Sequence, residues 1–539
     1  MLRKKFIRII LYILAGFLFV LAALFVFYKI VTKVEEPVMP AEKEVSMDRV
    51  SDGPYAWHCE HGWLRKEREG WWLMYLEGSP YEVGYAHGLL TQELNYKQEK
   101  AFLERLAELI PTNTYQRFML SFVRFFNRNL EDYVKEEYRR EIYGISRFAS
   151  PDFGFMGPAY ARMLNYHAAH DLGHAVQNMN LVACTAFGAW GSHSADSSLI
   201  IGRNFDFYVN DDFARDKILC FIQPDSGYSF AMITWAGFAG VVSGMNENGL
   251  TITLNAAKSS IPTGAKTPVS LLAREILQYA ANIDEAYGIA KSRETFVAES
   301  FFIGSAADHK AVVIEKSPES IDIYDPDTSF IVVTNHFQSN TFLNDLLNVE
   351  NMQNETSVYR MERVRELLAE NPKVGPETAA AILRDYKGLG GKDIGLSNEK
   401  AVNQFIAHHS VIFQPDSLRL WIAEPPYQLG DYWSFNFEGI TKSHKEEDIP
   451  SDRNLLNVKY PELIKYRALV AKIESGQYTE GDADSLINYN PEFFHTYRVL
   501  GDYFKSKEGK KAEMYYRMAL EKEAPSAAER KDAEGIEFE

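Results

Sequence analysis

A solitary cysteine at the head of an apolar run is the residue whose chemistry stands out first. Cys184 is one of three cysteines in 539 residues. A second apolar run, at 199–207, follows the polar turn at 192–198 and carries Arg203 and Asp206. A cysteine nucleophile needs a base to take its proton and donors to stabilise the oxyanion that it creates. We therefore predict an antiparallel pair of strands that brings Arg203 and Asp206 beside Cys184.

The sequence supplies two kinds of base for this thiol. One is a histidine, as in papain-like enzymes, and the candidates are His336, His408 and His409. The other is the cysteine's own α-amino group, which has a pKa of about 8 once the bond from Ala183 to Cys184 is cut. That route requires the cysteine to head a strand. The residues alone leave both routes open, and a lone cysteine in an apolar strand is also a common inert core residue.

Four short motifs follow one another in order along one region of the chain. They are Cys-Thr-x-Phe at 184–187, Gly-Arg-Asn-Phe-Asp at 202–206, Asn-Glu-x-Gly-Leu at 246–250 and Thr-Asn at 334–335. This set resembles the N-terminal nucleophile hydrolases, and within them the cysteine branch of penicillin V acylase, bile-salt (choloylglycine) hydrolase and the acyl-coenzyme A:6-aminopenicillanate acyltransferases. GSPYEVGYAHG at 78–88 and SVIF at 410–413 favour the self-cleaving, acyltransferase-like subgroup. The resemblance covers roughly residues 73–423 and implies an α+β fold, a four-layer αββα sandwich.

The resemblance implies a self-processing nucleophile at Cys184. Cleavage between Ala183 and Cys184 would free the amine that serves as the base. Arg203 is then the cation that favours the thiolate, and Asp206 is the carboxylate that holds the amine by a charge-assisted hydrogen bond. The family often has glycine before the cysteine, where this chain has the similarly small Ala183. A structural ion pair is the alternative interpretation of Arg203 and Asp206.

The resemblance also implies an oxyanion hole and a second arginine. The backbone N–H of Asn255 and the side-chain amide of Asn335 would stabilise the oxyanion, although asparagines also commonly close turns. Arg360 matches the family's second arginine. Arg363 and Arg365 lie close by on the same predicted helix, so the assignment depends on which of the three faces the cysteine.

The N-terminus is typical of a membrane anchor. Residues 9–28 carry no charge, and about 20 such residues are what a helix needs to cross a bilayer. No small-x-small cleavage site follows directly, which favours a retained signal-anchor over a cleaved signal peptide or a buried core helix. A cluster of basic residues at 3–8 precedes the run and outnumbers the lysines just after it. We therefore expect a single-pass protein whose catalytic domain is extracytoplasmic, in the periplasm or at the cell surface.

Composition divides the chain into five parts. Residues 1–32 form the basic segment and anchor, 33–54 a linker, 55–183 a helical segment, 184–441 the catalytic core, and 442–539 a linker with a helical tail. The spacing of leucine, glycine, alanine and tyrosine in the tail is typical of one tetratricopeptide-like (TPR-like) hairpin, which we expect to dock on the main domain or to cap the preceding helix at 460–475. The formal charge of −17 argues against a nucleic-acid binder.

Two further sets of residues bear on metals and disulfides. His167, His170 and His174 share one face of a predicted helix. Imidazole suits zinc, but without cysteine ligands or a His-Glu-x-x-His pattern we expect polar packing, with no metal and no cofactor. Cys59 and Cys220 could pair outside the cytoplasm, and their spacing leaves that pairing open.

The predicted activity is hydrolysis of a linear, non-peptide amide in a small N-acyl substrate, through a thioester. One alternative is an acyltransferase that passes the acyl group to an amine, because the same residues serve both reactions. The other is a catalytically inactive scaffold that acts through its helical tail. The tail is also a candidate surface for a protein partner or a second copy of the chain.

Overall fold

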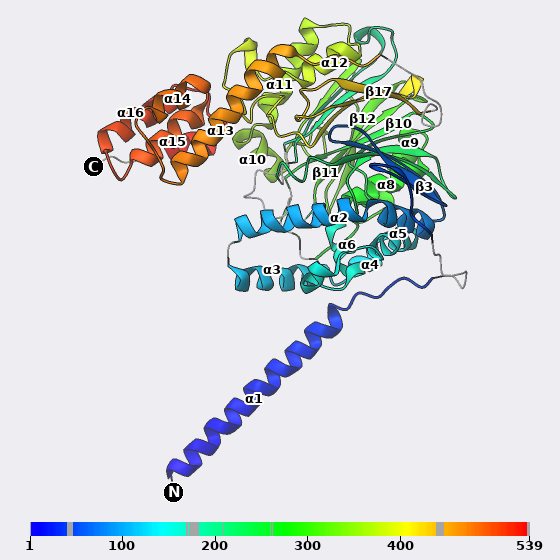
Figure 1. Ribbon diagram of the computed structural model, residues 1–539, viewed down its shortest axis with the longest axis vertical. Helices are drawn as coiled ribbons and strands as arrows, with labels where there is room; N and C mark the ends of the chain where they lie inside the picture. The colour runs from blue at the N-terminus through cyan, green and yellow to red at the C-terminus, as the bar shows by residue number, and fades with distance from the viewer. Residues whose placement is uncertain are drawn as a thin grey trace.

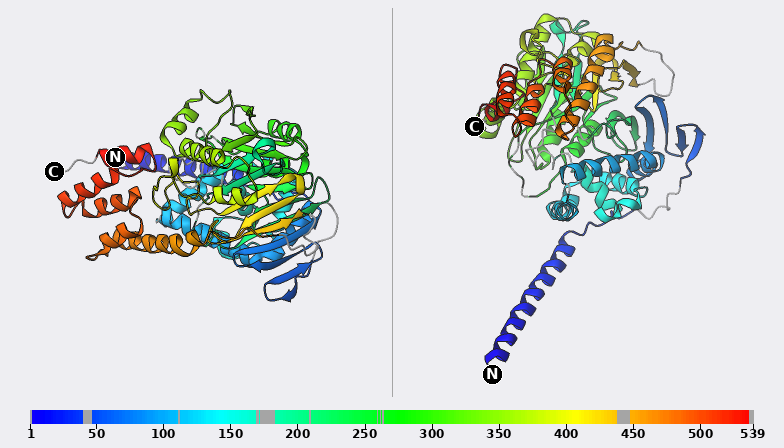
Figure 2. Two further views of the ribbon diagram at one scale, coloured as in Figure 1. Left: turned by 90° about the horizontal axis from the view of Figure 1, so that it is seen from above. Right: turned by 60° about the vertical axis from the view of Figure 1, so that its left-hand side comes forward.

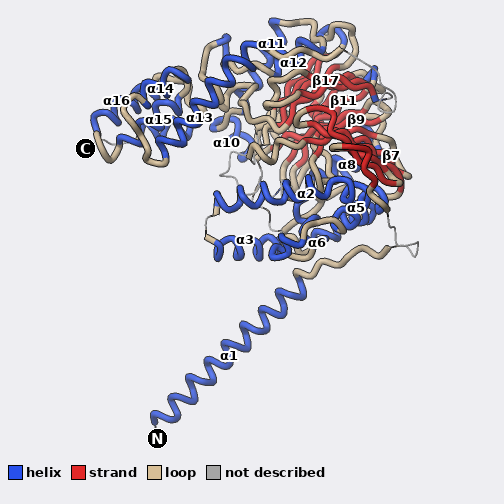
Figure 3. The backbone as a smooth tube through the Cα atoms, viewed as in Figure 1, coloured by secondary structure: helices blue, strands red, loops and turns tan. Residues whose placement is uncertain are grey.

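Two β-sheets pack face to face in the computed structural model, and helices cover their outer faces (Figure 1 and Figure 3). The structure describes residues 2–39, 47–110, 112–168, 171, 183–207, 210–258, 260, 262, 264–437 and 447–535. The order of layers is helices, sheet, sheet, helices, as the resemblance implied.

Within the described residues the larger sheet has 11 strands, and its neighbouring strands are antiparallel except for the parallel pair β4 and β7. In sheet order the strands are β1 (Val50–Gly53), β2 (Ala56–Cys59), β3 (Gly62–Arg68), β4 (Trp71–Gly78), β7 (Lys217–Pro224), β8 (Phe230–Thr234), β9 (Ser243–Asn246), β10 (Leu250–Ala256), β11 (Glu299–Ser305), β12 (Lys310–Lys316) and β13 (Ile321–Tyr324). The central strands β7 to β11 are buried along almost their whole length because layers cover both faces of the sheet.

The smaller sheet has 6 strands and carries the predicted cysteine strand at its second position. In sheet order they are β14 (Phe330–Val333), β5 (Thr185–Ala189), β6 (Ile200–Phe205), β15 (His409–Gln414), β16 (Arg419–Ala423) and β17 (Tyr432–Asn436). Strands β5 and β6 pair antiparallel, as predicted.

Three apolar cores hold the four layers together. The inner core joins Leu219 and Phe221 of the larger sheet to Ile201 and Val411 of the smaller one. The outer face of the smaller sheet packs on α11 (Ser357–Glu370) and α12 (Pro376–Leu383). The outer face of the larger sheet packs on a helical layer formed by α2 (Pro80–Leu109), α5 (Glu136–Ser146), α6 (Ala159–His167), α8 (Val269–Tyr279) and α9 (Ile283–Ser292). Beside these layers lie α3 (Asn113–Phe126), α4 (Leu130–Tyr133) and α10 (Leu346–Asn354).

The segment 55–183, predicted as largely helical, also supplies strands to the larger sheet. Strand β4 leads into the turn before α2, where Glu82 accepts a hydrogen bond from the Ser79 N–H at 2.9 Å to cap that helix. Strands β1 to β3 were not predicted, and β1 lies in the segment 33–54 that was predicted as a linker. Strands β1 and β2 are each 4 residues long and β3 carries a run of charged residues, so none of them gives a clear strand signal in the sequence. The proposed division at residue 183 therefore runs through one continuous sheet.

Helix α1 (Leu2–Val31) projects away from the layered domain (Figure 1). Its residues Lys5–Val31 are long and apolar enough to cross a membrane, and none of that apolar window is buried in the protein. A helix with these properties near the N-terminus is a membrane anchor or a signal sequence.

The C-terminal helices form a unit that packs on the catalytic part of the chain (Figure 2). They are α13 (Tyr460–Glu474), α14 (Asp482–Tyr489), α15 (Phe494–Phe504), α16 (Gly509–Leu520) and α17 (Ala527–Glu534). Their core includes Leu396, Phe405 and Leu429 from the loops beside the smaller sheet, so the tail docks on the main domain as predicted. Helices α15 and α16 form a hairpin in which Gly501 lies against the ring of Tyr516, while its identity as a TPR-like repeat stays a prediction.

Candidate active site

Cys184 immediately precedes β5 and is fully buried. The register of β5 and β6 sets Ala186 opposite Arg203. The Arg203 side chain returns to the cysteine, and its Nη2 lies 3.6 Å from Sγ of Cys184. The sequence prediction that the polar turn carries Arg203 back beside Cys184 is therefore confirmed.

The larger sheet fixes the Arg203 guanidinium in place. Nη1 donates to the carbonyl of Val242 at 3.0 Å and to Oγ of Ser243 at 2.5 Å, and Nη2 donates to the carbonyl of Leu254. The guanidinium also lies 4.4 Å from the centre of the Phe205 ring. Because Arg203 starts from one sheet and bonds to the other, the cation has little freedom to leave the thiol.

Burial dominates the electrostatics of the nucleophile. It raises the pKa of the Cys184 thiol to about 11, although the nearby Arg203 guanidinium lowers that pKa. Burial also raises the pKa of the Asp206 carboxyl to about 7, against the lowering effect of Arg360 and Arg203. Neither carboxyl oxygen of Asp206 has a hydrogen-bond partner among the residues that the structure describes. The intact chain thus holds a protonated thiol next to a carboxyl group that ionises near neutral pH.

Arg360 is the arginine of α11 that faces the cysteine. Its Nη1 donates to the Cys184 carbonyl at 2.6 Å, and its Nη2 donates to Oδ1 of Asn335 at 2.7 Å. Arg363 and Arg365 form ion pairs elsewhere on the helix surface. Among the three candidates in this helix, only Arg360 reaches the site.

The two asparagines of the predicted oxyanion hole lie in neighbouring segments. Asn335 follows β14, and its Nδ2 donates to the Ala256 carbonyl at 3.0 Å. Asn255 lies in β10, where its Nδ2 is 3.4 Å from the Val333 carbonyl. The Asn335 amide has two N–H donors, so one can stay on the Ala256 carbonyl while the other donates to an oxyanion.

The carbonyl of the bond expected to be cut has two side-chain donors. Nε2 of Gln404 lies 3.3 Å from the Ala183 oxygen, and Nη1 of Arg360 lies 3.4 Å from it. The Ala183 N–H donates to the Asp206 carbonyl at 3.0 Å. Sequence reasoning missed Gln404, which belongs to no motif and lies in a loop before β15.

The alternative histidine bases lie in other hydrogen-bond networks. His336 bonds to a hydroxyl at the start of α11, and His409 bonds through Nε2 to Ser243 at 2.8 Å. His408 and His409 share a bond between their Nδ1 atoms at 3.0 Å. None of the histidines in the described residues forms a hydrogen bond with Sγ of Cys184. Burial lowers the pKa of all three rings, so they stay uncharged at neutral pH.

His167, Cys59 and Cys220, which the sequence also singles out, are buried. His167 bonds through Nε2 to the Ala239 N–H at 2.9 Å, while His170 and His174 lie outside the described residues. Cys59 and Cys220 are both buried free thiols.

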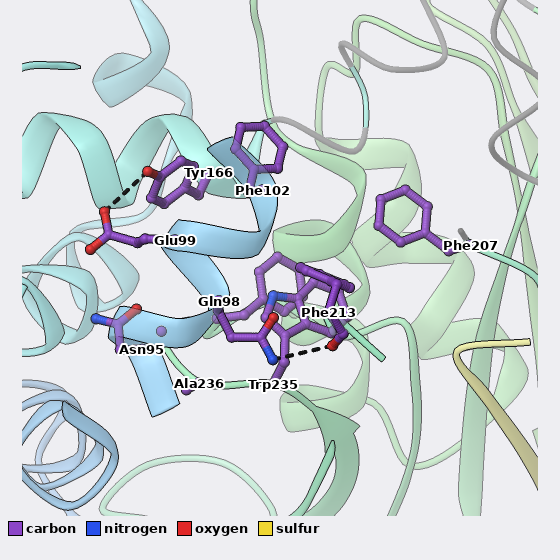
Figure 4. Close-up of a pocket in the computed structure, with 11 residues that line it drawn as sticks. Asn95, Gln98, Glu99, Phe102, Tyr166, Phe207, Phe213, Trp235 and Ala236 are labelled. Atoms are coloured by element: carbon purple, nitrogen blue, oxygen red, sulfur yellow. Dashed lines mark hydrogen bonds between the residues drawn. The ribbon is translucent and has the colours of Figure 1, made fainter. Parts of the chain in front are cut away.

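An apolar pocket of about 60 Å³ lies between α2 and the residues that follow β8 (Figure 4). Its wall is largely aromatic, and Phe207 on that wall stacks on Phe205 with ring centres 5.5 Å apart. Phe205 in turn lies under the Arg203 guanidinium. The lining residues are Asn95, Gln98, Glu99, Phe102, Tyr166, Phe207, Phe213, Trp235, Ala236, Gly237 and Phe238. One aromatic ring therefore separates the pocket wall from the arginine that touches Cys184.

Comparison with known families agrees with the resemblance drawn from the motifs. Residues 193–425 match the family model of acyl-coenzyme A:6-aminopenicillanic acid acyl-transferase. The matched region includes Arg203, Asp206, Asn255, Asn335 and Arg360, and it begins after the cysteine. The predicted resemblance to this family is confirmed.

Individual relatives share only part of the chain. An uncharacterized protein of Archaeoglobus fulgidus is 28% identical over 290 residues, which are 49% of this chain and 47% of the relative. The chain spans about half the length of the curated relatives it matches.

Two solved structures are similar over almost their whole length, which corresponds to half of this chain or less. An N-acylethanolamine-hydrolyzing acid amidase ortholog of Caenorhabditis elegans is 20% identical, with 43% of this chain and 93% of that chain covered and a TM-score of 0.31. A variant of conjugated bile acid hydrolase from Clostridium perfringens is 12% identical, with 50% and 97% covered and a TM-score of 0.32.

Proposed function

Because residues 193–425 match the family model of acyl-coenzyme A:6-aminopenicillanic acid acyl-transferase, we propose that the protein is a self-processing cysteine amidase. It cleaves the linear amide of a small N-acyl substrate through a thioester on Cys184. The observation that carries the proposal is the contact of Arg203 with the Cys184 sulfur, next to a buried Asp206 carboxylate that lacks a hydrogen-bond partner among the described residues.

The first chemical step is the cleavage of the chain before Cys184. The thiol loses its proton to the Asp206 carboxylate, and the sulfur attacks the Ala183 carbonyl carbon. Gln404 and Arg360 face the oxygen on which the negative charge develops. The tetrahedral intermediate collapses by breaking the C–N bond, and the proton passes to the leaving nitrogen. Water then hydrolyses the thioester and releases a carboxylate on Ala183.

Cleavage creates the base that the intact chain lacks. The new α-amine of Cys184 has an ordinary pKa of about 8 and can take the thiol proton at neutral pH. The Asp206 carboxylate then has a cation to pair with, which offsets the cost of burying it. Arg203 stays beside the sulfur and lowers the energy of the thiolate.

Turnover repeats the same chemistry on a substrate amide. The thiolate attacks the substrate carbonyl, and the N–H of Asn255 with the amide of Asn335 stabilises the oxyanion. The substrate amine leaves with the proton from the Cys184 amine. Water, activated by that amine, then hydrolyses the thioester and frees the acid. The aromatic pocket supports an apolar acyl or aromatic group on the substrate.

Acyl transfer is the second candidate, because the matched family is named for it. In that reaction an amine takes the place of water in the second half. Product analysis with and without an added amine distinguishes the two candidates, since only a transferase forms the new amide at the expense of the free acid.

The test of the main proposal is intact-mass analysis combined with an amide screen. Active enzyme should consist of two associated chains, one ending at Ala183 and one starting at Cys184. The screen should include N-acyl amino acids, acyl homoserine lactones, penicillin V and bile-acid conjugates. Fully active enzyme with an unbroken bond at this position would replace the proposal by a histidine-based mechanism through His336 or His409.

We also propose that α1 is retained as a single-pass anchor with the catalytic domain outside the cytoplasm. The uncharged run and the basic cluster before it support this orientation. Protease added outside spheroplasts should digest or shed the catalytic domain. Protection of that domain from protease in sealed spheroplasts would show that it lies in the cytoplasm, opposite to the proposed orientation.

A further inference from the structure

We propose that helix α3 is an interfacial membrane helix that lays the catalytic domain on the bilayer spanned by α1. The surface consists of five aromatic side chains, here termed the aromatic face. They are Tyr115, Phe118, Phe122 and Phe125 of α3, and Phe155 of the neighbouring 3-10 turn Pro151–Met156. The partner is a lipid surface that contains anionic headgroups. The inference rests on the proposed anchor, and not on the proposed catalysis.

The side chains of the aromatic face are too exposed to belong to the core of the protein. The exposed fractions along the helix are 53% for Tyr115, 63% for Phe118, 51% for Phe122 and 38% for Phe125. Spacings of three and four residues set these side chains on one side of an α-helix. Phe155 adds a fifth ring that is 64% exposed. Contiguous apolar surface of this kind marks a contact with a protein or a membrane.

Contacts between segments hold Phe155 beside the helix. Arg124 of α3 donates through Nε to the Met156 carbonyl at 3.1 Å, and through Nη2 to the Phe155 carbonyl at 3.4 Å. These bonds fix the segment that carries the exposed Phe155 against α3.

Contacts at the C-terminal end of α1 indicate how the aromatic face is positioned relative to the bilayer. Tyr28 closes the uncharged run, and its hydroxyl donates to the Ser121 carbonyl in the middle of α3 at 3.1 Å. Seven residues later, the Glu35 N–H donates to the Glu131 carboxylate at 3.0 Å. A tyrosine at the end of a spanning helix lies at headgroup level. Helix α3 is bonded to that tyrosine, so it lies at the same level.

The position of α3 in the fold agrees with its placement at the level of the lipid headgroups. Figure 1 shows α3 along the edge of the layered domain from which α1 projects. A helix in the plane of the interface, next to one that crosses it, buries its aromatic side about 5–10 Å into the headgroup and acyl boundary.

The charges on α3 identify the kind of lipid. The helix contains Arg117 and Arg124 and no acidic residue. Arg128 follows directly, with its guanidinium 4.5 Å from the centre of the Phe125 ring. Guanidinium groups pair with phosphate through two hydrogen bonds, and each cation near an anionic surface strengthens attachment. These arginines would attract any acidic surface, and the bond between α3 and Tyr28 at the end of the apolar run is what favours a bilayer over a second copy of this acidic chain.

The experiment places nitroxide labels on the full-length chain in nanodiscs of phosphatidylcholine and phosphatidylglycerol. Cys184→Ala provides the background, because the other two cysteines are buried. Labels are introduced singly at Phe118→Cys in the aromatic face, at Phe17→Cys in the anchor, and at Met514→Cys in α16, which is an exposed apolar control. Collision of each label with oxygen and with a water-soluble nickel chelate reports its depth.

The label at 118 should collide with the nickel chelate about tenfold less than the label at 514, because the interface excludes water. Equal access of the chelate to both positions would overturn the inference. A label at 17 that lies in the bilayer while 118 stays in water would leave the anchor standing and remove the interfacial helix. Dipolar broadening between chains at 118 would also overturn it, by assigning the surface to self-association.

A second measurement avoids the labels. Phe118→Ser combined with Phe122→Ser should abolish the lipid-dependent protection of α3 amides from hydrogen exchange, while the chain stays in the nanodisc. Leu346→Ser in α10 is the matched control, since Leu346 is 84% exposed and lies away from the aromatic face. Unchanged protection in the double variant would refute the assignment.

Discussion

Replacing Gln404 by leucine removes one of the two side-chain donors that face the Ala183 carbonyl in the intact chain. Nε2 of Gln404 lies 3.3 Å from that oxygen, and Nη1 of Arg360, at 3.4 Å, remains in the variant. Gln404 is buried, and its Oε1 has no hydrogen-bond partner among the described residues. Leucine has a similar volume, so the change removes the donor without opening a cavity.

The size of the effect follows from the role of the donor. Loss of one oxyanion donor typically slows a reaction by about a hundred- to a thousand-fold. The Gln404 contact is at the long end of hydrogen-bond distances, so we expect the lower limit, about a hundred-fold slower self-cleavage, or about 2.7 kcal/mol. Stability should not fall, because the substitution also removes a buried acceptor left unpaired.

The assay follows the intact chain by mass spectrometry and denaturing gel after expression, and measures turnover per cleaved chain. Gln428→Leu is the matched control, because Gln428 is also buried, its Oε1 has no partner within the described part of the chain, and its Nε2 donates to Leu383 instead of Ala183. Turnover per cleaved chain should be unchanged by Gln404→Leu. The reasoning is refuted if Gln404→Leu cleaves no more slowly than Gln428→Leu.

The other predictions concern the nucleophile, the oxyanion hole, the proton acceptor and the anchor. Cys184→Ala should leave one intact, inactive chain, and Cys184→Ser should cleave slowly, since a hydroxyl is the poorer nucleophile; two chains from the alanine variant would contradict this. Asn335→Ala should lower turnover by about a hundred- to a thousand-fold with the fold intact, whereas a loss below about tenfold would make Asn335 a turn residue. Self-cleavage should accelerate as the pH rises through about 7, where the Asp206 carboxyl ionises, and a flat rate on both sides of that pH would exclude Asp206 as the acceptor. The protein should sediment with membranes, and release of the full-length chain by high salt alone would contradict the anchor.

Local patterns made the centre of the site predictable. Cys184 and Arg203 are joined by one hairpin, so alternation and turn residues suffice to place them together. Arg360 was harder to predict, because its helix carries three arginines. Only the docking of α11 on the smaller sheet decides which of them points toward Cys184. Gln404 was out of reach: it contacts Ala183 across 221 residues of sequence, from a loop without a motif.

The sequence does not predict the effect of burial on the pKa of the Cys184 thiol. The sequence predicts that Arg203 favours the thiolate, and the guanidinium does lower the pKa of Cys184. The larger effect comes from the second sheet, which covers the thiol and raises that pKa. A single sequence shows the neighbours along a strand, whereas the desolvation of a site depends on the layer above it.

The intact site carries an imbalance that the proposed cleavage would correct. Asp206 is fully buried, its carboxyl oxygens lack hydrogen-bond partners among the described residues, and its pKa is raised to about 7. Such a group is costly in a folded protein unless a donor or a cation reaches it. The Ala183 N–H already bonds to the backbone carbonyl of Asp206 at 3.0 Å, so the nitrogen of Cys184 is the next backbone nitrogen after one that is bonded to this residue. Breaking the bond between Ala183 and Cys184 turns that nitrogen into an amine with free N–H donors. The same event supplies the base for the thiol and the partner for the carboxylate, which is why the intact chain can be folded and still chemically incomplete.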